Sequence, residues 1–270
     1  MVKLFLGCHQ LSFSGPKDEN LSKILDVLTD SNADLDIFPE YAMGIPLKGL
    51  TRRYVQRNAE PLKGEFVTKI VEKTLQKQSS VVFTTFLKEG DVYYNAAILA
   101  EGGKIRSIYR KIHLFDAFGY EESKLFTPGR ELAITTFRGF NVGLAVCFDI
   151  RFPELFRSMA YRGVNLFIVP SGWYKGKNKL EQWRFLIMAR AHENASYLVA
   201  VDQILPFFIG HSMVASPLGY RIQEVGDEQA SFKVELNKEE IDKAEKVVPI
   251  IKLSKPRLYR EFDENIQRGI

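Results

Sequence analysis

The chain has 270 residues, of which 46% are hydrophobic and 26% are charged, and a chain of this size can bury a substantial core within one domain. Its 37 basic and 33 acidic residues give a formal net charge of +4 without any long basic run, which argues against nucleic acid as a partner. No apolar stretch approaches the roughly 20 residues that span a bilayer, and "LFLG" after Lys3 is too short for a signal-peptide core. We therefore expect a soluble, unprocessed protein that does not bind membranes.

Cysteine and histidine are sparse. The two cysteines, Cys8 and Cys147, provide neither a disulfide framework nor a metal-binding spacing, and the four histidines are scattered along the chain. The sequence therefore predicts no metal and no other cofactor, and we expect a reducing, cytoplasmic setting.

The first half of the chain alternates short runs rich in Val, Ile and Phe with helical patterns. A first helix is predicted over 16–32 and a second over Phe66 to Gln78. The predicted strands cover 2–8, 35–38, 80–87, 93–100 and 104–110. "EGGK" separates the last two strands and predicts a hairpin, because glycine accepts the positive φ angles of tight turns.

The second half continues the pattern, with helices predicted over 153–163 and about 180–194. The predicted strands cover 132–137, 141–147, 164–170, 197–203, 211–216, 219–225 and 231–236. This order indicates an α/β domain over 1–246 whose sheet or sheets are covered by helices; periodicity does not distinguish one sheet from two. Residues 247–270 are predicted to form an extended, charged tail that is either disordered or docked on a neighbouring subunit.

A first candidate for chemistry lies in "AVCFDIRFPE". Cys147 ends an apolar run, and Pro153 suits the first turn of the helix that follows. At such a strand-to-helix turn, nearby N–H groups can lower the pKa of a thiol and hold an oxyanion. The alternative is a buried structural cysteine, since cysteine is among the most buried residue types.

A thiol nucleophile needs a base, and three residues are candidate partners. Glu40 in "DLDIFPEYAMG" follows an apolar strand, where desolvation can raise the pKa of a carboxyl towards neutrality. Lys111 ends another predicted strand, and its ammonium can stabilise an oxyanion. His113 is a rival base for Cys147. Each of Glu40 and Lys111 could instead be an ordinary solvated residue at a strand end.

The three motifs "FPEY", "YRKIHLF" and "CFDIRFPE" occur in this order, and together they resemble the nitrilase, or carbon-nitrogen hydrolase, superfamily. The resemblance extends from "KLFLGCHQ" to about "SFKVEL" and includes "PSGW", "ARAHENASYLVA" and "GHSMVASPLG". It implies a four-layer α-β-β-α sandwich for the domain 1–246. It also implies a homodimer or higher homo-oligomer, formed through the helices next to the cysteine turn and aided by the C-terminal tail.

The resemblance assigns roles residue by residue. Glu40 matches the general base, Lys111 the oxyanion-stabilising lysine and Cys147 the nucleophile. Family members also carry a second glutamate in the loop after the lysine, for which "YEES" offers Glu121 and Glu122. Similar members place this glutamate directly before a serine, which favours Glu122.

The residues after the cysteine indicate the branch of the family. True nitrilases generally have Trp-Glu there and carbamoylases often have Asn-Asp with a double arginine, whereas this chain has Phe148 and Asp149. "CFDIRFPE" most resembles omega-amidases and deaminated-glutathione amidases. The prediction is an amidase that cleaves the terminal amide of a small carboxylic-acid amide through a cysteine thioester. A nitrilase, an N-carbamoyl-amine amidohydrolase and a non-catalytic ligand-binding protein remain as alternatives.

Several side chains near these motifs are candidates for contact with the small-molecule substrate. They are Tyr120, Phe148, Ser171, Trp173 and Tyr174. Arg151 is predicted either to receive a substrate carboxylate or, as the simpler interpretation, to pair with a nearby carboxylate such as that of Glu154.

Overall fold

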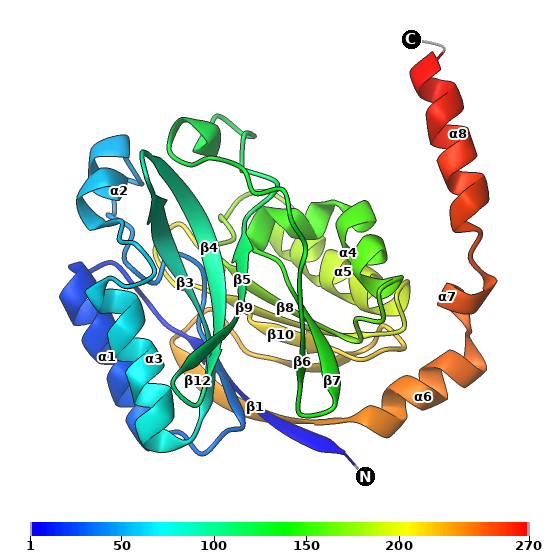
Figure 1. Cartoon of the computed structure of the whole chain (residues 1–270), viewed down its shortest axis with the longest axis horizontal. Coiled ribbons are helices and arrows are strands. Elements are labelled where there is room, and N and C mark those ends of the chain that lie inside the picture. Colours follow the sequence, from blue (N-terminus) through cyan, green and yellow to red (C-terminus); the bar gives the residue numbers. More distant parts are fainter. Residues whose placement is uncertain (1, 269–270) are drawn as a thin grey trace.

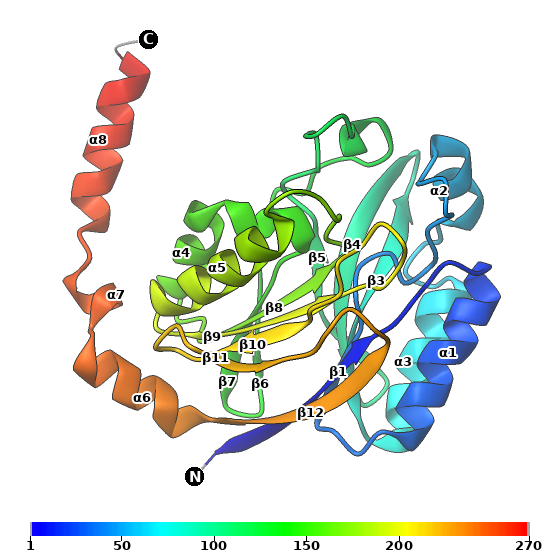
Figure 2. The ribbon, with the colours of Figure 1, turned by 180° about the vertical axis from the view of Figure 1, so that it is seen from behind.

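The apolar strands of the sequence form two six-stranded sheets in a computed structural model that describes residues 2–268 (Figures 1 and 2). The first sheet has the order β12-β1-β2-β3-β4-β5. Its strands are β1 (Lys3–Gln10), β2 (Leu35–Ile37), β3 (Ser80–Glu89), β4 (Val92–Glu101), β5 (Lys104–Arg110) and β12 (Ala230–Asn237). The second sheet has the order β11-β10-β9-β8-β7-β6. Its strands are β6 (Ala133–Phe137), β7 (Phe140–Leu144), β8 (Leu166–Ser171), β9 (Tyr197–Asp202), β10 (Met213–Ala215) and β11 (Arg221–Glu224).

Helices cover the outer faces of the two sheets. Figure 2 shows α1 (Lys17–Asp30) and α3 (Glu65–Lys77) outside the first sheet, and α4 (Pro153–Ala160) and α5 (Lys179–His192) outside the second. Each helix buries an apolar stripe; in α1 it contains Leu21, Ile24 and Leu28. The predicted four-layer α-β-β-α sandwich is therefore confirmed.

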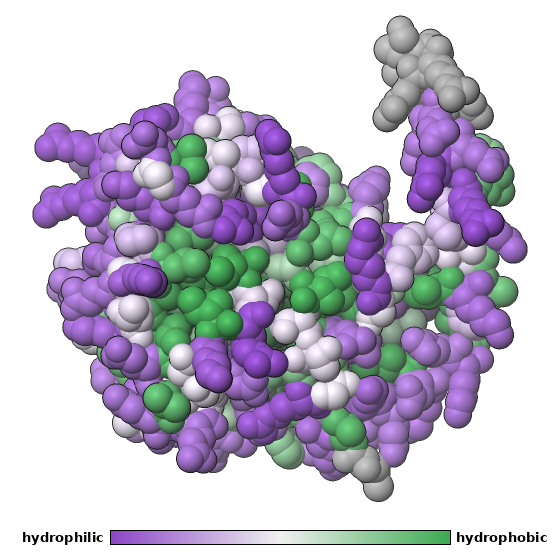
Figure 3. Space-filling view, in the orientation of Figure 1, coloured by the Kyte–Doolittle hydropathy of each residue, from purple (hydrophilic) through white to green (hydrophobic). Residues whose placement is uncertain are grey.

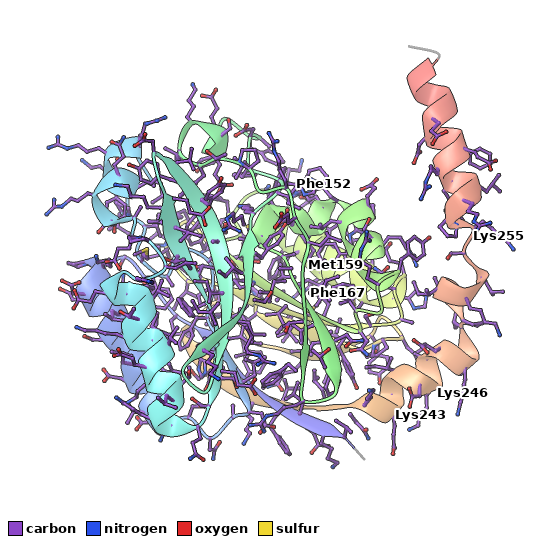
Figure 4. The ribbon with its side chains drawn as sticks, in the orientation of Figure 1. Phe152, Met159, Phe167, Lys243, Lys246 and Lys255 are labelled. Atoms are coloured by element: carbon purple, nitrogen blue, oxygen red, sulfur yellow. The ribbon has the colours of Figure 1, made fainter. Side chains whose placement is uncertain are left out.

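Close packing of α4 on the second sheet depends on a glycine. A Cβ at Gly143 in β7 would lie 2.8 Å from the Met159 sulfur and 3.4 Å from the Phe167 ring. Figure 4 labels Met159 and Phe167, which lie where α4 meets the sheet. A side chain at position 143 would push α4, and with it the turn that precedes α4, away from β7.

The strand directions place the ends of several strands at one end of the sandwich. β1, β2 and β3 are parallel, and so are β7, β8 and β9. Two hairpin pairings, β3 with β4 and β4 with β5, return β5 to the direction of β2. The two sheets meet directly at this end, where the Glu40 N–H donates to the Ser171 carbonyl at 3.2 Å. The segments that follow β2, β5, β7 and β8 thus converge.

Three features differ from the sequence predictions. β7 ends at Leu144, because Cys147 already belongs to the short 3₁₀ helix η2 (Cys147–Arg151). α2 (Arg52–Asn58) was not predicted; Thr51 caps it by accepting the Tyr54 N–H. α6 (Lys238–Val247) was not predicted either, although its cap Asn237 accepts the Glu239 N–H in the same way.

The tail is helical where an extended conformation was predicted, so that prediction is wrong. α7 (Ile250–Leu253) and α8 (Pro256–Arg268) follow α6 and lead away from the sandwich (Figures 1 and 2). Pro256 begins α8, where a missing N–H costs no hydrogen bond. Met1 of the predicted domain 1–246 and residues 269–270 of the predicted tail 247–270 lie outside the described residues.

The tail combines apolar and basic side chains. Its exposed apolar residues are Val247, Leu253, Leu258, Tyr259 and Phe262, and Figure 3 shows apolar residues along this segment among hydrophilic ones. Lys255 lies in the tail, and Lys243 and Lys246 lie in α6 just before it (Figure 4). The tail thus exposes apolar area that the sandwich itself does not cover.

Candidate active site

Cys147 is held out of its strand by a left-handed backbone. Its φ is 47°, a region that costs a residue with a Cβ roughly 1–2 kcal/mol. Asp149 fixes the turn: one carboxylate oxygen accepts the Val146 N–H at 2.9 Å and the Tyr109 hydroxyl at 2.8 Å, and the other accepts the His113 N–H at 3.0 Å. The turn η2 is therefore a strained nucleophile elbow held by a buried carboxylate.

Glu40 follows β2 and is completely buried. Its Oε1 accepts from Lys111 Nζ at 2.8 Å and from Asn95 Nδ2 at 2.7 Å. Its Oε2 accepts the Gly172 N–H at 2.9 Å, and the Cys147 thiol lies close enough to the same carboxylate for each group to shift the pKa of the other. The carboxylate thus binds the ammonium and lies beside the thiol, where it can act as a base for the sulfur.

The Lys111 ammonium lies between two carboxylates. It is 2.8 Å from Glu40 Oε1 and 2.8 Å from Glu122 Oε2. Glu122 also accepts from Asn95 Nδ2 at 2.9 Å and from the Phe115 N–H at 2.7 Å. The structure therefore brings Glu122, and not Glu121, to the site; Glu121 is exposed and pairs with Lys124.

Asn95 is the residue of this cluster that sequence reasoning missed. Its amide nitrogen joins Glu40 and Glu122. The sequence did contain a signal, because Asn95 is an uncharged polar residue within the apolar run "YYNAAILA". In the structure this residue lies in β4 and is completely buried. Buried polar groups in a strand need partners, so such a residue marks a polar network.

Burial and the neighbouring charges set the protonation states. Burial raises the pKa of the Glu40 carboxyl; the Lys111 charge opposes this, and the net shift is upward. Burial and the Glu40 charge raise the pKa of the Cys147 thiol well above its ordinary value, although Lys111 opposes the rise. Burial alone lowers the pKa of Lys111, but Glu122 and Glu40 outweigh it and the net pKa is well raised. The thiol is therefore neutral at rest, next to a basic carboxylate and a permanent cation.

A small cavity opens on the nucleophile. Its lining includes Lys111, Cys147, Phe148, Trp173 and Tyr174, and its free volume is about 10 Å³, room for about one water molecule. Three residues predicted to contact substrate thus line the cavity.

The other two predicted contacts lie elsewhere. Tyr120 lines an outer pocket of about 410 Å³, where its ring centroid is 4.4 Å from that of Tyr174. The Ser171 hydroxyl is buried and donates to the Val169 carbonyl at 3.2 Å. At this point the cavity is lined by Gly172 instead of Ser171.

Two further predictions concern groups beside the cavity. His113 Nδ1 lies 2.8 Å from an Asp149 oxygen and the ring stacks on Phe152 at 3.7 Å, so this histidine supports the elbow, and Glu40 is the carboxylate beside the thiol. Arg151 lines the cavity and donates to Gln182 at 2.9 Å. The predicted pairing of Arg151 with Glu154 is absent from the ion pairs of residues 2–268 and is therefore wrong.

The part of the chain that the structure describes has neither a metal-binding cluster nor a membrane-spanning helix. In it, no three His, Cys, Asp or Glu side chains gather as metal ligands would. No helix between residues 2 and 268 has both the length and the apolar character needed to cross a membrane. Both cysteines are free and buried.

An α-β-β-α sandwich with Glu, Lys and Cys side chains converging on a strained elbow is the architecture of a carbon-nitrogen hydrolase. The chain belongs to that family: the carbon-nitrogen hydrolase family model matches residues 6–245. The family predicted from the sequence motifs is thus confirmed.

Known proteins of this kind are similar over most of their length. A hydrolase of Mycobacterium tuberculosis is 32% identical over 243 residues, which cover 82% of this chain and 84% of the relative. The omega-amidase of Homo sapiens is 26% identical over 274 residues, which cover 96% of this chain and 98% of the relative. The crystal structure of a Xanthomonas campestris protein of the same superfamily has a TM-score of 0.85 at 22% identity and covers 94% of this chain and 98% of that one, which shows a shared fold.

Proposed function

We propose that this protein is an amidase that hydrolyses the terminal amide of a small carboxylic-acid amide through a thioester on Cys147. The observation that carries the proposal is that one buried carboxylate, Glu40, binds the Lys111 ammonium and lies beside the Cys147 thiol. The similarity to the human omega-amidase supports an amide substrate.

The first half of the reaction uses Glu40 as the base. Glu40 takes the proton of the thiol, and the sulfur attacks the amide carbon to form a C–S bond. The carbonyl oxygen becomes an oxyanion, which Lys111 and the Phe148 N–H stabilise; Phe148 is the second residue of η2, where a helical N–H lacks a partner within the helix. Protonated Glu40 then donates its proton to the nitrogen, the C–N bond breaks, and ammonia leaves.

The second half returns the enzyme to its starting state. Glu40 takes a proton from water, and the hydroxide attacks the thioester carbon. Collapse breaks the C–S bond, releases the acid and leaves the thiolate, which recovers its proton from Glu40. Proton transfer of this kind contributes about 10²–10⁴-fold in rate.

Glu122 and Asn95 keep Lys111 in position in this proposal. Lys111 carries its positive charge in a buried site only because two carboxylates compensate it. A fixed ammonium needs little rearrangement when the oxyanion forms, which is the condition under which electrostatic stabilisation is most effective.

Ammonia release from a panel of compounds tests the proposal. The panel contains succinamate, a neutral aliphatic amide, an N-carbamoyl amino acid and a nitrile, each offered to the wild type and to Cys147→Ala. The matched control is Cys8→Ala, which removes the other buried thiol, one that does not line the cavity. We expect the amides to be hydrolysed by the wild type and by Cys8→Ala but not by Cys147→Ala.

The alternatives predict different results. Preference for the nitrile or the carbamoyl compound would assign the same mechanism to a different substrate. Turnover of no compound would favour a ligand-binding protein, and turnover that survives Cys147→Ala would refute the assigned nucleophile.

We also propose that the protein is a homodimer in which the tail packs on the second copy. The exposed apolar residues of α7 and α8, among them Leu253, Leu258 and Phe262, lie on helices that lead away from the sandwich. A short, isolated helix is marginally stable in water, so an external surface would stabilise these turns. Light scattering of the purified protein tests this, since a monomeric mass would contradict the proposal.

A cytoplasmic location is part of the same proposal. Both cysteines are free, and the proposed nucleophile must remain reduced. Cell fractionation tests the location: recovery of the protein in an oxidising compartment would contradict it.

A further inference from the structure

A second chain of hydrogen-bonded side chains lies on the first sheet, and none of its members lines the Cys147 cavity. It joins His9 of β1, Asp36 of β2 and Ser231 of β12, the strand at the edge of the sheet (Figure 2). His9 Nε2 lies 2.7 Å from Asp36 Oδ1, and His9 Nδ1 lies 2.9 Å from Ser231 Oγ. A serine, a histidine and an aspartate are thus connected in series.

The register of the three strands builds this arrangement. Ser231 pairs with His9, and Gly7 pairs with Lys233 on one side and with Asp36 on the other. Side chains two residues apart point to the same face of a strand, so Ser231 and Lys233 share one face. A Cβ at Gly7 would lie 2.4 Å from Asp36 Oδ1 and 3.0 Å from His9 Nε2. The glycine therefore leaves the space that the histidine–aspartate hydrogen bond occupies.

The carboxylate determines which ring nitrogen of His9 carries hydrogen. Because an ionised carboxylate only accepts hydrogen bonds, the His9 hydrogen lies on Nε2 and donates to Asp36 Oδ1. Nδ1 then keeps its lone pair and accepts the Ser231 hydroxyl, which is the relation of a general base to a serine nucleophile.

Asp36 also favours a positive charge on His9. The carboxylate is completely buried, and the Ser31 hydroxyl donates to Oδ1 at 2.6 Å. Asp36 Oδ2 has no hydrogen-bond partner among residues 2–268. The buried negative charge is therefore compensated best when His9 takes up a proton and becomes an imidazolium.

Exposure distinguishes this chain from a purely structural tie. His9 is only 6% exposed, whereas Ser231 is exposed to solvent. Both line a pocket of about 420 Å³. The strand ladder already joins β1 to β12, so a tie between these strands needs neither a pocket nor an accessible hydroxyl. A nucleophile needs both.

The charges of the pocket indicate the kind of substrate. The Lys233 ammonium lines the pocket and donates to the carbonyl and side-chain oxygens of Asn32 at 3.1 and 3.0 Å. Both acceptors are uncharged, so its positive charge can stabilise an oxyanion formed beside Ser231. Asp26 and Asp30 are exposed and line the same pocket, which disfavours an anionic substrate.

We propose that Ser231 and His9 form a second catalytic site, positioned by Asp36, that hydrolyses neutral esters of small carboxylic acids independently of Cys147. His9 Nδ1 takes the Ser231 proton, and Oγ forms a bond to the ester carbonyl carbon. Collapse of the oxyanion breaks the bond to the alcohol oxygen, and the alcohol leaves with the proton from His9. Water then gives a proton to His9, and its hydroxide attacks the acyl-serine. The acid leaves, and Ser231 recovers its proton.

Release of p-nitrophenol from p-nitrophenyl acetate tests the proposal. The assay uses Cys147→Ala, so that the thiol of the first site does not react with the ester. Adding Ser231→Ala should lower kcat/KM by at least about 100-fold, because the nucleophile and its general base no longer act together. The matched control adds Ser22→Ala instead, which removes an exposed hydroxyl that donates only to the Asp18 carbonyl, and keeps kcat/KM unchanged.

Two further measurements identify the nucleophile and the role of Asp36. Tryptic peptide 222–233 contains Ser231 as its only hydroxyl side chain, and we expect mass spectrometry of acid-quenched Cys147→Ala to find an acetyl group on it. Asp36→Asn should lower kcat for the ester with little change in KM, since Asp36 acts through His9 and does not touch the substrate. Where Asp36→Asn does not fold, Ser231→Ala at its exposed position still decides the proposal.

The outcomes are independent of the amidase proposal. Equal ester turnover with Ser231→Ala and with Ser22→Ala, or no acetyl group on peptide 222–233, would overturn the second site. Ser231→Ala in the chain that retains Cys147 should hydrolyse succinamate as the wild type does. Absence of amide turnover in the wild type would refute the amidase proposal and leave the ester result to stand alone.

Discussion

Replacement of Glu122 by glutamine tests the buried network behind the proposed nucleophile. Glu122 accepts hydrogen bonds on both oxygens: Oε1 from Asn95, and Oε2 from Lys111 and from the Phe115 N–H. A glutamine of the same size turns one of these oxygens into a donor. In either orientation, a buried donor then faces another donor, and the compensating charge beside Lys111 is lost.

The expected magnitude follows from these contacts. Breaking a buried charge pair costs about 3–5 kcal/mol, so we expect the free energy of unfolding of Glu122→Gln to fall by about that amount. If the displaced Lys111 no longer stabilises the oxyanion, kcat falls on the order of 10²–10³-fold. Urea denaturation and steady-state ammonia release measure the two effects.

The adjacent glutamate provides the control. Glu121 is exposed and pairs only with Lys124, so Glu121→Gln should change the free energy of unfolding by less than about 0.5 kcal/mol and leave kcat unchanged. If Glu122→Gln behaved like Glu121→Gln in both assays, the reasoning about the buried network would be refuted.

Three further predictions concern the site and the tail. A Cβ at Gly129 would lie 2.1 Å from the Arg110 carbonyl oxygen, so Gly129→Ala should displace the end of β5, lower the free energy of unfolding by about 1–3 kcal/mol and lower kcat. The control is Gly226→Ala, whose added Cβ meets open space; equal behaviour of the two variants would contradict this prediction. Because the pKa of Glu40 is raised, and the base form is required, kcat/KM should rise with pH through a value above the ordinary 4.5; an acid limb at or below that value would contradict the assignment. Removal of residues 247–270 should reduce the mass measured by light scattering from dimer towards monomer, and an unchanged dimer would show that the tail is not required.

The approximate ends of the strands were predictable from the sequence, and with them the positions of Glu40, Lys111 and Cys147, although β7 ends three residues before Cys147. Each lies at or just after the end of a predicted strand, and the end of a strand lies at an edge of the sheet. The number of sheets was not predictable in this way, because strands such as β8 are buried on both faces and show no alternation.

Asn95 could not be assigned from the sequence because its surroundings come from distant segments. Asn95 lies beside Glu40 and Glu122 only once β2, β4 and the loop after β5 are packed. Helices α6 to α8 were missed for a different reason. Their sequences are highly charged and contain few apolar residues, so the helical spacing of those apolar residues is hard to recognise.

The most direct test of the account is the mass of the protein during turnover. The wild type is mixed with succinamate, quenched in acid within the first turnovers, digested and analysed by mass spectrometry. The thioester mechanism predicts an acyl group on the peptide that contains Cys147, formed together with one equivalent of ammonia and absent from Cys147→Ala. Ammonia release without any adduct on Cys147, or an adduct on another residue, would contradict the proposed thioester mechanism.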